Sequence, residues 1–212
     1  MDATRIIAIR HGETAWNVDT RIQGHLDIPL NDTGRWQASR LGAALAGEPL
    51  AAIYASDLGR AHQTAQAVGE AAGLAVVADR GLRERAFGEF EGKTFAEIEA
   101  AWPDQALLWR RRDPDFEPAG GESLLRFRAR IVATLNRLAA RHAGEQIVLV
   151  GHGGVMDVLY RTATGQELQA PRTWALGNAA INRLLWTPQG LALVGWADTG
   201  HLDDAALDET ST

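Results

Sequence analysis

Two histidines follow apolar runs that are typical of buried strands. His11 comes two residues after the run Ile6–Ile9, and His152 comes two residues after the run Ile147–Val150. Each histidine is followed by glycine, which lets the backbone approach a ligand closely. A neutral imidazole in such a position is able to attack phosphorus and form a covalent phosphoenzyme. A lone histidine after a strand is more often structural, but the pair in the same setting favours a ligand site.

Two arginines belong to the same pattern. Arg10 adjoins His11, and Arg60 falls in the first turn of a helix predicted to follow the apolar run 51–56. Two guanidinium groups beside a helix N-terminus suit a dianion, and their planar forks fit phosphate best. Because arginines can neutralise the phosphate charge, neither a metal ion nor a cofactor is expected.

The acid that this chemistry needs is less clearly marked. A carboxylic acid must protonate the leaving oxygen, and Glu84 lies in the loop after the third predicted strand. Glu89 and Glu91 lie close by in that loop, so spacing alone does not choose among the three carboxyl groups. Ser56 and Asp57 precede the helix after the second predicted strand, and we assign them as its caps because these residue types favour that position.

The elements that must position these groups alternate along the chain. Short, continuous apolar runs predict strands within residues 5–12, 51–56, 74–79 and 145–154. Helical patterns lie between them, and a final hairpin is predicted from the stretches 179–187 and 190–198. This alternation predicts an α/β fold with three α/β/α layers and a mostly parallel sheet. Because ligands bind at the carboxyl ends of such strands, the histidines and arginines are expected to converge there.

The 212-residue chain is expected to form a single domain spanning residues 1–212. Residues 80–122 are less regular and are predicted to form a lid-like segment over one end of the sheet. Residues 201–212 are polar and acidic, which predicts a loose tail. Arg110, Arg111 and Arg112 are interpreted as a solvated helix face, with a second anion contact as the alternative.

Composition excludes several classes of protein. The chain has no cysteine, which excludes disulfides, thiolate nucleophiles and cysteine-based zinc sites. Its net charge of −6 argues against a nucleic-acid partner. No apolar run approaches the ~20 residues of a membrane span, and no signal-peptide pattern follows Met1. A cytoplasmic protein is expected, and an apolar edge strand near the C-terminus leaves a homodimer possible. The anion site described above suits a small-molecule partner that carries phosphate.

The same residues lie in a series of motifs that resembles a known family. The stretches RHGETAWN, RIQGHLDIPLNDTGRWQA, YASDLGRAHQTA, LRERAFGEFEGKT, GGES and VLVGHGGVM follow in this order. Together they resemble the histidine phosphatase superfamily, the phosphoglycerate mutase-like group. The resemblance runs from about residue 4 to residue 200. It implies the phosphoglycerate mutase-like fold and phosphoryl transfer chemistry.

The resemblance implies five catalytic roles. His11 is similar to the nucleophile that becomes phosphohistidine, and Arg10 and Arg60 are similar to the arginines that clamp the phosphate. His152 resembles the second pocket histidine, which donates to a phosphoryl oxygen. Glu84 occupies the position of the proton donor, a choice that spacing alone left open.

Five further positions are implied to contact phosphate or substrate. Thr14 and Asn17 match positions where the family contacts phosphate or substrate, Gln23 and Gly24 match its substrate loop, and Gly153 would offer its backbone N–H. For His11 to attack, its ring must be neutral, and neighbouring arginines disfavour its protonation. Its other ring nitrogen is expected to donate to a backbone carbonyl, which fixes the tautomer.

Within this family the phosphoryl acceptor is either water or a second hydroxyl group. Cofactor-dependent mutases resemble this chain less, because they are longer and carry a tyrosine where this chain has Phe87. The stretches FGEFEGKT and GGES are more similar to the small phosphatases, which include broad-specificity, α-ribazole phosphate and sugar-phosphate types. Phosphomonoester hydrolysis is therefore predicted. A phosphoglycerate mutase and a weakly catalytic member that binds phosphorylated ligands are the alternatives.

Overall fold

The computed structural model describes residues 2–203, and this part of the chain forms a six-stranded sheet in the order β3-β2-β4-β1-β5-β6. Strands β1 to β4 pair in parallel, while β5 pairs antiparallel with both β1 and β6. The strands are β1 (Thr4–Arg10), β2 (Ala52–Ala55), β3 (Val76–Ala78), β4 (Gln146–Gly151), β5 (Ile181–Thr187) and β6 (Gly190–Asp198). The predicted α/β fold with a mostly parallel sheet is confirmed.

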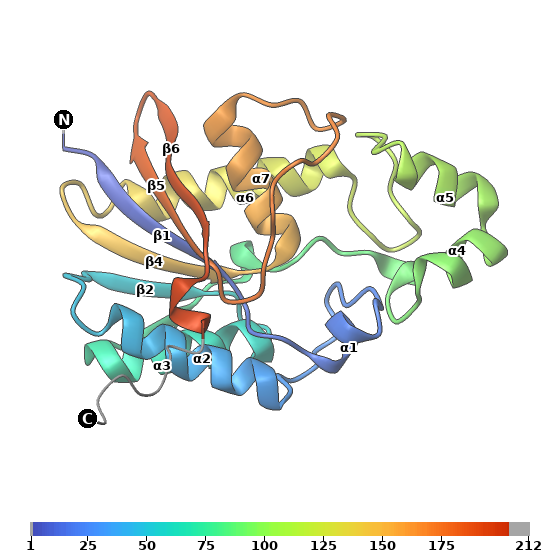
Figure 1. Ribbon diagram of the computed structural model, residues 1–212. Coiled ribbons are helices and arrows are strands. Elements are labelled where there is room, and N and C mark those ends of the chain that lie inside the picture. The colour runs from blue at the N-terminus through green and yellow to red at the C-terminus, as the bar shows by residue number, and fades with distance from the viewer. Residues whose placement is uncertain (1, 204–212) are drawn as a thin grey trace.

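Helices cover both faces of the sheet (Figure 1). Helices α2 (Asp32–Leu45) and α3 (Gly59–Ala72) pack on one face, and α6 (Leu124–Ala139) and α7 (Gly153–Thr164) pack on the other. The two faces enclose separate apolar cores, one on each side of β1 and β4. Strands buried on both faces need apolar residues throughout, which is why their sequences are continuous apolar runs.

The register of the parallel strands β1 and β4 determines where the two histidines lie along the edge of the sheet. Arg10 is paired with Gly151 across β1 and β4, so the residues that follow them, His11 and His152, emerge at the same level. The backbone N–H of His11 donates to the Gly151 carbonyl at 3.0 Å and continues the ladder by one residue. Neighbouring parallel strands end at one edge of the sheet, and the predicted convergence at that edge follows from this pairing.

Residues 80–122 form an irregular segment beside that edge. It contains the 3₁₀ turns η1 (Arg80–Leu82) and η2 (Gly88–Phe90) and the helices α4 (Phe95–Ala101) and α5 (Pro103–Arg110). These two helices lie beside the sheet, on the side of the short helix α1 (Ala15–Val18), which the sequence did not predict (Figure 1). The segment has its own small apolar core, built on Phe90, Ile98 and Ala106. Its lid function stays a prediction.

The C-terminal part of the described chain returns to the sheet. The hairpin of β5 and β6 forms as predicted, and β6 is the edge strand, with Val194 65% exposed. Of the predicted loose tail, the 3₁₀ turn η3 (Gly200–Leu202) packs against α2 instead, where Arg40 Nε donates to the His201 carbonyl at 2.9 Å. Residues 204–212 of that tail lie outside the described residues, and a homodimer through β6 stays a prediction.

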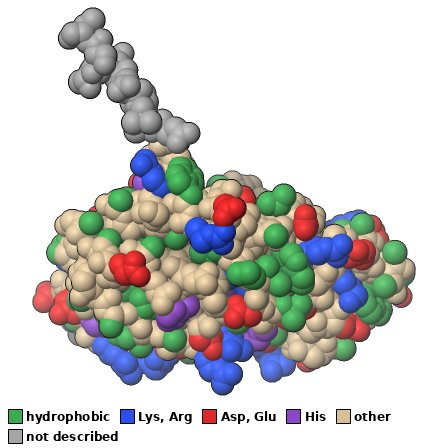
Figure 2. All heavy atoms as spheres, turned by 90° about the horizontal axis from the view of Figure 1, so that it is seen from below, with side chains coloured by type: hydrophobic (Ala, Val, Ile, Leu, Met, Phe, Trp, Pro, Cys, Tyr) green, Lys and Arg blue, Asp and Glu red, His purple; other side chains and the backbone are tan. Residues whose placement is uncertain are grey.

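The surface below the sheet carries no single type of side chain. In the view from below Figure 1, acidic, basic and hydrophobic side chains are interspersed (Figure 2). This mixed face agrees with the net charge of −6 in giving no broad basic surface on that side. Among residues 2–203, no helix has both the length and the apolar character needed to cross a membrane.

Candidate active site

A cavity of about 170 Å³ lies where β1, β2 and β4 end. Eight of the ten residues predicted for the site line it, namely Arg10, His11, Asn17, Gln23, Gly24, Arg60, Glu84 and Gly153. His152 and Thr14 do not line it, and Arg21, Ile22 and Phe87 complete the wall. The tertiary structure thus brings together groups that are far apart in the sequence, around a space that fits one small anionic group.

His11 is held as a neutral imidazole with a defined tautomer. Its Nδ1 lies 2.7 Å from the Gly12 carbonyl oxygen. A carbonyl oxygen only accepts, so Nδ1 carries the proton and Nε2 keeps its lone pair. Burial lowers the pKa of His11 well below its usual value, and the charges of Arg10 and Arg60 lower it further. The expected tether of Nδ1 to a backbone carbonyl is present, and the lowered pKa favours the neutral ring; the role of His11 as nucleophile stays a prediction.

His152 lies edge-on to His11, with 5.2 Å between the ring centroids. It is the N-cap residue of α7 and is fully buried. Neither of its ring nitrogens has a hydrogen-bond partner among the described residues. Burial lowers its pKa well below the usual value, with smaller contributions from Arg60 and His11. A buried ring nitrogen without a partner is uncommon, and it marks a place where a ligand atom is expected.

Arg10 and Arg60 carry charge into the cavity wall without an acidic partner. Arg60 is 1% exposed, and its Nη1 and Nη2 donate to the carbonyls of Leu26 and Gly24 at 2.8 and 2.9 Å. Arg10 Nη1 donates to the Leu176 carbonyl. The Nε atoms of both arginines are buried without a hydrogen-bond partner, and no carboxylate in residues 2–203 forms an ion pair with either. Burying such charges is costly unless a counter-ion arrives, so the pair fits a dianion.

The Glu84 carboxyl group is oriented by two backbone N–H groups. Its Oε1 accepts from Arg85 N at 2.8 Å, and its Oε2 accepts from Gly154 N at 3.0 Å. A Cβ at position 154 would lie 2.2 Å from Glu84 Oε1, so a larger residue there would push this carboxyl group aside. Of the three glutamates that spacing left open, Glu84 is the one whose carboxyl reaches the first turn of α7.

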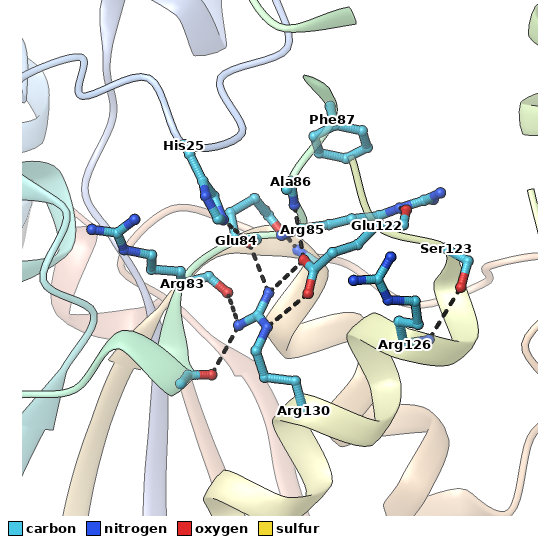
Figure 3. A network of polar contacts seen from close by, with 12 residues as sticks. His25, Arg83, Glu84, Arg85, Ala86, Phe87, Glu122, Ser123, Arg126 and Arg130 are labelled. Atoms are coloured by element: carbon cyan, nitrogen blue, oxygen red, sulfur yellow. Dashed lines mark hydrogen bonds and ion pairs between the residues drawn. The ribbon is translucent and has the colours of Figure 1, made fainter. Parts of the chain in front are cut away.

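One arginine of α6 holds the loop that carries this acid (Figure 3). Arg130 Nη1 donates to the carbonyls of Gly81 and Arg83, both at 3.0 Å, and Nη2 donates to the carbonyl of Glu84 at 3.1 Å. Its guanidinium group also pairs with Glu122, at 2.9 and 2.7 Å. Sequence reasoning missed Arg130, because it lies 46 residues from Glu84 in a helix whose pattern explains it as an ordinary surface position.

His25 adds a contact on the other side of this loop. Its Nε2 lies 2.9 Å from the Glu84 carbonyl oxygen, so His25 supports the backbone of this loop (Figure 3). In the same stretch, Gly24 has a φ of +50°, and a Cβ there would lie 2.1 Å from Glu91 Oε1. Glu91 therefore serves the loop rather than the cavity, because the same oxygen accepts from the N–H groups of His25 and Phe87.

Thr14 has a different place from the one predicted. It is fully buried, and its hydroxyl accepts from Asn17 N at 3.2 Å while Asn17 Oδ1 accepts from Thr14 N at 3.0 Å. This capping box begins α1 and turns the Asn17 side chain toward the cavity. Asn178 Nδ2 contacts both the His11 carbonyl, at 2.8 Å, and Asn17 Oδ1, at 3.3 Å. Asn178 had no signal in the sequence, since only the turn before β5 places it there.

The helix caps proposed for Ser56 and Asp57 are corrected. The N-cap of α3 is Leu58, which makes no side-chain capping bond, and Ser56 only accepts from Leu58 N at 3.3 Å. Asp57 instead forms a bidentate pair with Arg83, with two contacts of 2.7 Å. A bidentate ion pair is stronger than a hydrogen bond to a backbone N–H at a helix cap. Arg83 lies in another loop, so the residues next to Asp57 do not indicate this partner.

The three arginines at residues 110–112 have different environments. Arg110 pairs with Glu99 at the surface, and Arg111 is exposed, as predicted for a solvated face. Arg112 is different, because its Nη2 contacts Asp157 of α7 at 2.7 Å and its Nε donates to the Leu168 carbonyl at 2.7 Å. It connects residues 80–122 to α7, a role that neither of the two interpretations included.

The chemistry of this site can be supplied by the protein itself. Within residues 2–203, no group of three or more His, Asp or Glu residues is placed to hold a metal ion. The cavity wall combines an imidazole, two guanidinium groups and a carboxyl group. That set can bind a phosphoryl group, attack it and exchange a proton with the departing oxygen.

Comparisons with known proteins find relatives with phosphatase and mutase-like names. A protein from Arabidopsis thaliana named phosphoglycerate mutase-like protein 4 is 40% identical, covering 98% of this chain and 90% of its own. The structure of a mycobacterial glucosyl-3-phosphoglycerate phosphatase is 33% identical with a TM-score of 0.79, over 92% of this chain and 99% of its own. The α-ribazole phosphatase from Shigella flexneri is 25% identical with a TM-score of 0.83, over 92% and 96%.

A family model bears directly on the whole described chain. The model described as histidine phosphatase superfamily (branch 1) matches residues 6–199, nearly the same range over which the motifs were recognised. The matched range contains every residue that lines the cavity. This protein therefore belongs to the histidine phosphatase superfamily.

Proposed function

We propose that the protein hydrolyses small phosphomonoesters through a phosphohistidine at His11. One observation carries the proposal, namely that a neutral His11, tethered through Nδ1, shares a cavity with two buried arginines that have no acidic partner. A phosphoryl dianion supplies the missing counter-charge and presents phosphorus to Nε2. The site supports phosphoryl transfer, since superfamily relatives with similar structures are phosphatases.

In the first step, His11 Nε2 attacks phosphorus and the bond from phosphorus to the leaving oxygen breaks. Arg10 and Arg60 stabilise the charge on the phosphoryl oxygens, and His152 is the further donor beside them. The Glu84 carboxyl, in its protonated form, gives its proton to the leaving oxygen. The products of this step are the free alcohol, a phosphorylated His11 and an ionised Glu84.

In the second step, water replaces the alcohol. Glu84 takes a proton from the water molecule while the water oxygen attacks phosphorus. The bond between phosphorus and His11 Nε2 then breaks. Inorganic phosphate leaves, His11 returns to its neutral form and Glu84 regains its proton. Throughout, the bond from Nδ1 to the Gly12 carbonyl keeps the ring in place.

Mutase activity is the second candidate, because the 40%-identical relative carries a mutase-like name. A mutase passes the phosphoryl group to a second hydroxyl of a retained substrate rather than to water. The phosphatase names of structural neighbours that cover nearly all of this chain favour hydrolysis.

The test compares the two outcomes directly. Phosphate release is measured over a panel of phosphomonoesters with EDTA present, beside a coupled assay for interconversion of 3-phosphoglycerate and 2-phosphoglycerate with added 2,3-bisphosphoglycerate. Hydrolysis that withstands EDTA is expected. Robust mutase turnover with negligible phosphate release would overturn the proposal.

A further inference from the structure

A second cavity, of about 310 Å³, adjoins the phosphate cavity. The two cavities share Glu84 and Phe87 in their walls. Since Glu84 must touch the leaving oxygen to protonate it, the body of the leaving group extends from the phosphate cavity toward this second one. The second cavity is lined by apolar and aromatic side chains together with three arginines, Arg85, Arg112 and Arg172.

Arg85 is a buried cation on this wall. It is 4% exposed, and burial lowers its pKa to about 10, which still leaves it charged at neutral pH. Its Nε and Nη2 donate to the carbonyls of Glu122 and Phe116 at 2.7 and 3.0 Å. Its Nη1 makes no hydrogen bond within residues 2–203, and no carboxylate there forms an ion pair with it. Arg85 therefore lacks a counter-ion in direct contact, although the nearby carboxylates of Glu84 and Glu122 oppose the effect of burial on its pKa.

Arg172 reaches the same cavity from the loop after α7. It is exposed and forms no ion pair within residues 2–203. Arg172 lines the second cavity. Burial is the main cause that lowers the pKa of Arg10 and of Arg112, and the charge of Arg172 lowers both further. Arg112 is not free in the same way, because it contacts Asp157 at 2.7 Å, a carboxylate that it shares with Arg161 at 3.0 Å.

The charges around the two cavities do not balance. Arg10, Arg60, Arg85 and Arg172 contribute four positive charges without an ion pair inside the described chain, whereas Glu84 is the one acidic residue that lines both cavities. Asp157 lines the second cavity alone and is paired with both Arg112 and Arg161. A bound phosphoryl dianion and Glu84 together offset three of the four. When Glu84 carries the proton that it donates, two positive charges remain, and both belong to the leaving-group side.

We infer that the natural leaving group carries an anionic group, a carboxylate or a second phosphate, which Arg85 and Arg172 bind in the second cavity. This inference rests on the proposed phosphatase function and names the class of its substrate. The planar fork of arginine suits either anion. Phe87 and Trp109 form aromatic parts of the wall and suit an apolar linker between the two charged ends.

The test uses substrates that differ only in charge. Phosphate release from para-carboxyphenyl phosphate is compared with release from para-carbamoylphenyl phosphate, its neutral counterpart, and with release from hydroquinone bisphosphate. The anionic substrates are expected to have a kcat/KM about tenfold to a hundredfold higher than the neutral one. The substrate with the higher kcat/KM shows whether the natural leaving group carries a carboxylate or a second phosphate. Equal values for all three would overturn the inference while the proposed phosphatase stands.

Variants tie the preference to the residues. Arg172→Gln and Arg85→Gln are each expected to lower the ratio of kcat/KM between charged and neutral substrates by about tenfold. Arg111→Gln, an exposed change that lines neither cavity, is the matched control. A ratio that survives in Arg172→Gln overturns the assignment, even where Arg85→Gln does not fold. Absence of phosphate release from every substrate would overturn the proposed function, and this inference with it.

Discussion

Glu84 and Gly154 are joined by a hydrogen bond of 3.0 Å although they lie 70 residues apart in the chain. The bond ties the proposed proton donor to the first turn of α7, directly after His152. The loop that carries the acid is therefore joined to the segment that follows the second histidine. The contact leaves no room for a side chain at position 154.

Gly154→Ala is expected to displace the acid without removing it. The added Cβ would lie 2.2 Å from Glu84 Oε1, so the carboxyl group must shift. Misplacement of a catalytic group by about 1 Å can cost about a hundredfold in rate, so kcat for an alkyl phosphate should fall by about tenfold to a hundredfold.

The control for this variant is Gly47→Ala, where a Cβ meets nothing within 4 Å. Its steady-state rate for the alkyl phosphate should match the parent protein. If Gly154→Ala also matches the parent, Glu84 does not need the position that the structure gives it.

His11→Ala is expected to abolish turnover, because no other group in the cavity is placed to form the covalent intermediate. Phosphate release should fall at least about a thousandfold, as for other lost nucleophiles. A quench experiment with labelled substrate should give an acid-labile, base-stable phosphoprotein in the parent and none in the variant. His62→Ala, on α3 and outside the cavity, is the control. Substantial turnover in His11→Ala would contradict the assignment.

Glu84→Gln is expected to act through the leaving group. A general acid contributes about a hundredfold to ten-thousandfold when the leaving oxygen needs a proton, and far less when it does not. The loss in kcat should therefore be large for alkyl phosphates and small for an aryl phosphate with an acidic phenol. Equal losses across a series of leaving groups would show that Glu84 is not the proton donor.

Arg130→Gln is expected to destabilise the loop that carries Glu84 rather than the phosphate site. It removes bonds to three backbone carbonyls and to Glu122, which should lower the free energy of unfolding by about 2–3 kcal/mol. Where the protein stays folded, kcat should fall while inhibition by inorganic phosphate changes little. Arg126→Gln, an exposed position on the same helix, is the matched control. A purely structural role would leave kcat of the folded fraction at the parent value.

Stability should depend on pH through the two buried histidines. Burial and neighbouring arginines keep the pKa of His11 and His152 well below the usual value. Above about pH 6.5 both are neutral in the folded and unfolded chains, so they add no pH dependence. As the pH falls below that, the unfolded chain binds protons that the folded chain does not, and the free energy of unfolding decreases.

The decrease should reach at most about 1.4 kcal/mol per pH unit for each histidine, until the folded histidines protonate. The free energy of unfolding is measured by urea unfolding at several pH values across that acidic range. Its decrease per pH unit should be smaller in His11→Gln than in the parent. His62→Gln should keep the parent slope. An unchanged slope in His11→Gln would mean that this imidazole is not held neutral in the fold.

Much of the fold follows from local patterns. The continuous apolar runs of β1 and β4 predict strands buried on both faces, and the placement of Arg10, His11 and His152 after them predicts the edge where the ligand binds. The choice of Glu84 over Glu89 and Glu91 came from the family resemblance, since all three satisfy the same spacing.

Other parts of the site depend on contacts between distant segments. Arg130, Asn178 and Arg112 have side chains whose partners lie in other elements, and nothing within a few residues of them distinguishes them. Asp57 was assigned to a helix cap for the same reason, because its stronger partner, Arg83, comes from a loop 26 residues later. Local reasoning ranks only the interactions that neighbouring residues can make.

The sequence by itself determined the type of sheet and the edge at which Arg10, His11 and His152 lie, because strand burial and side-chain chemistry are local properties. The residues proposed for phosphoryl transfer came from that pattern together with the family resemblance. Tertiary structure alone decided the tautomer environment of His11, the orientation of Glu84 against Gly154 and the arginines that remain without an acidic partner. Those features depend on which segments meet across the cavity. Their meeting is set by strand register and helix packing, which act over the whole chain.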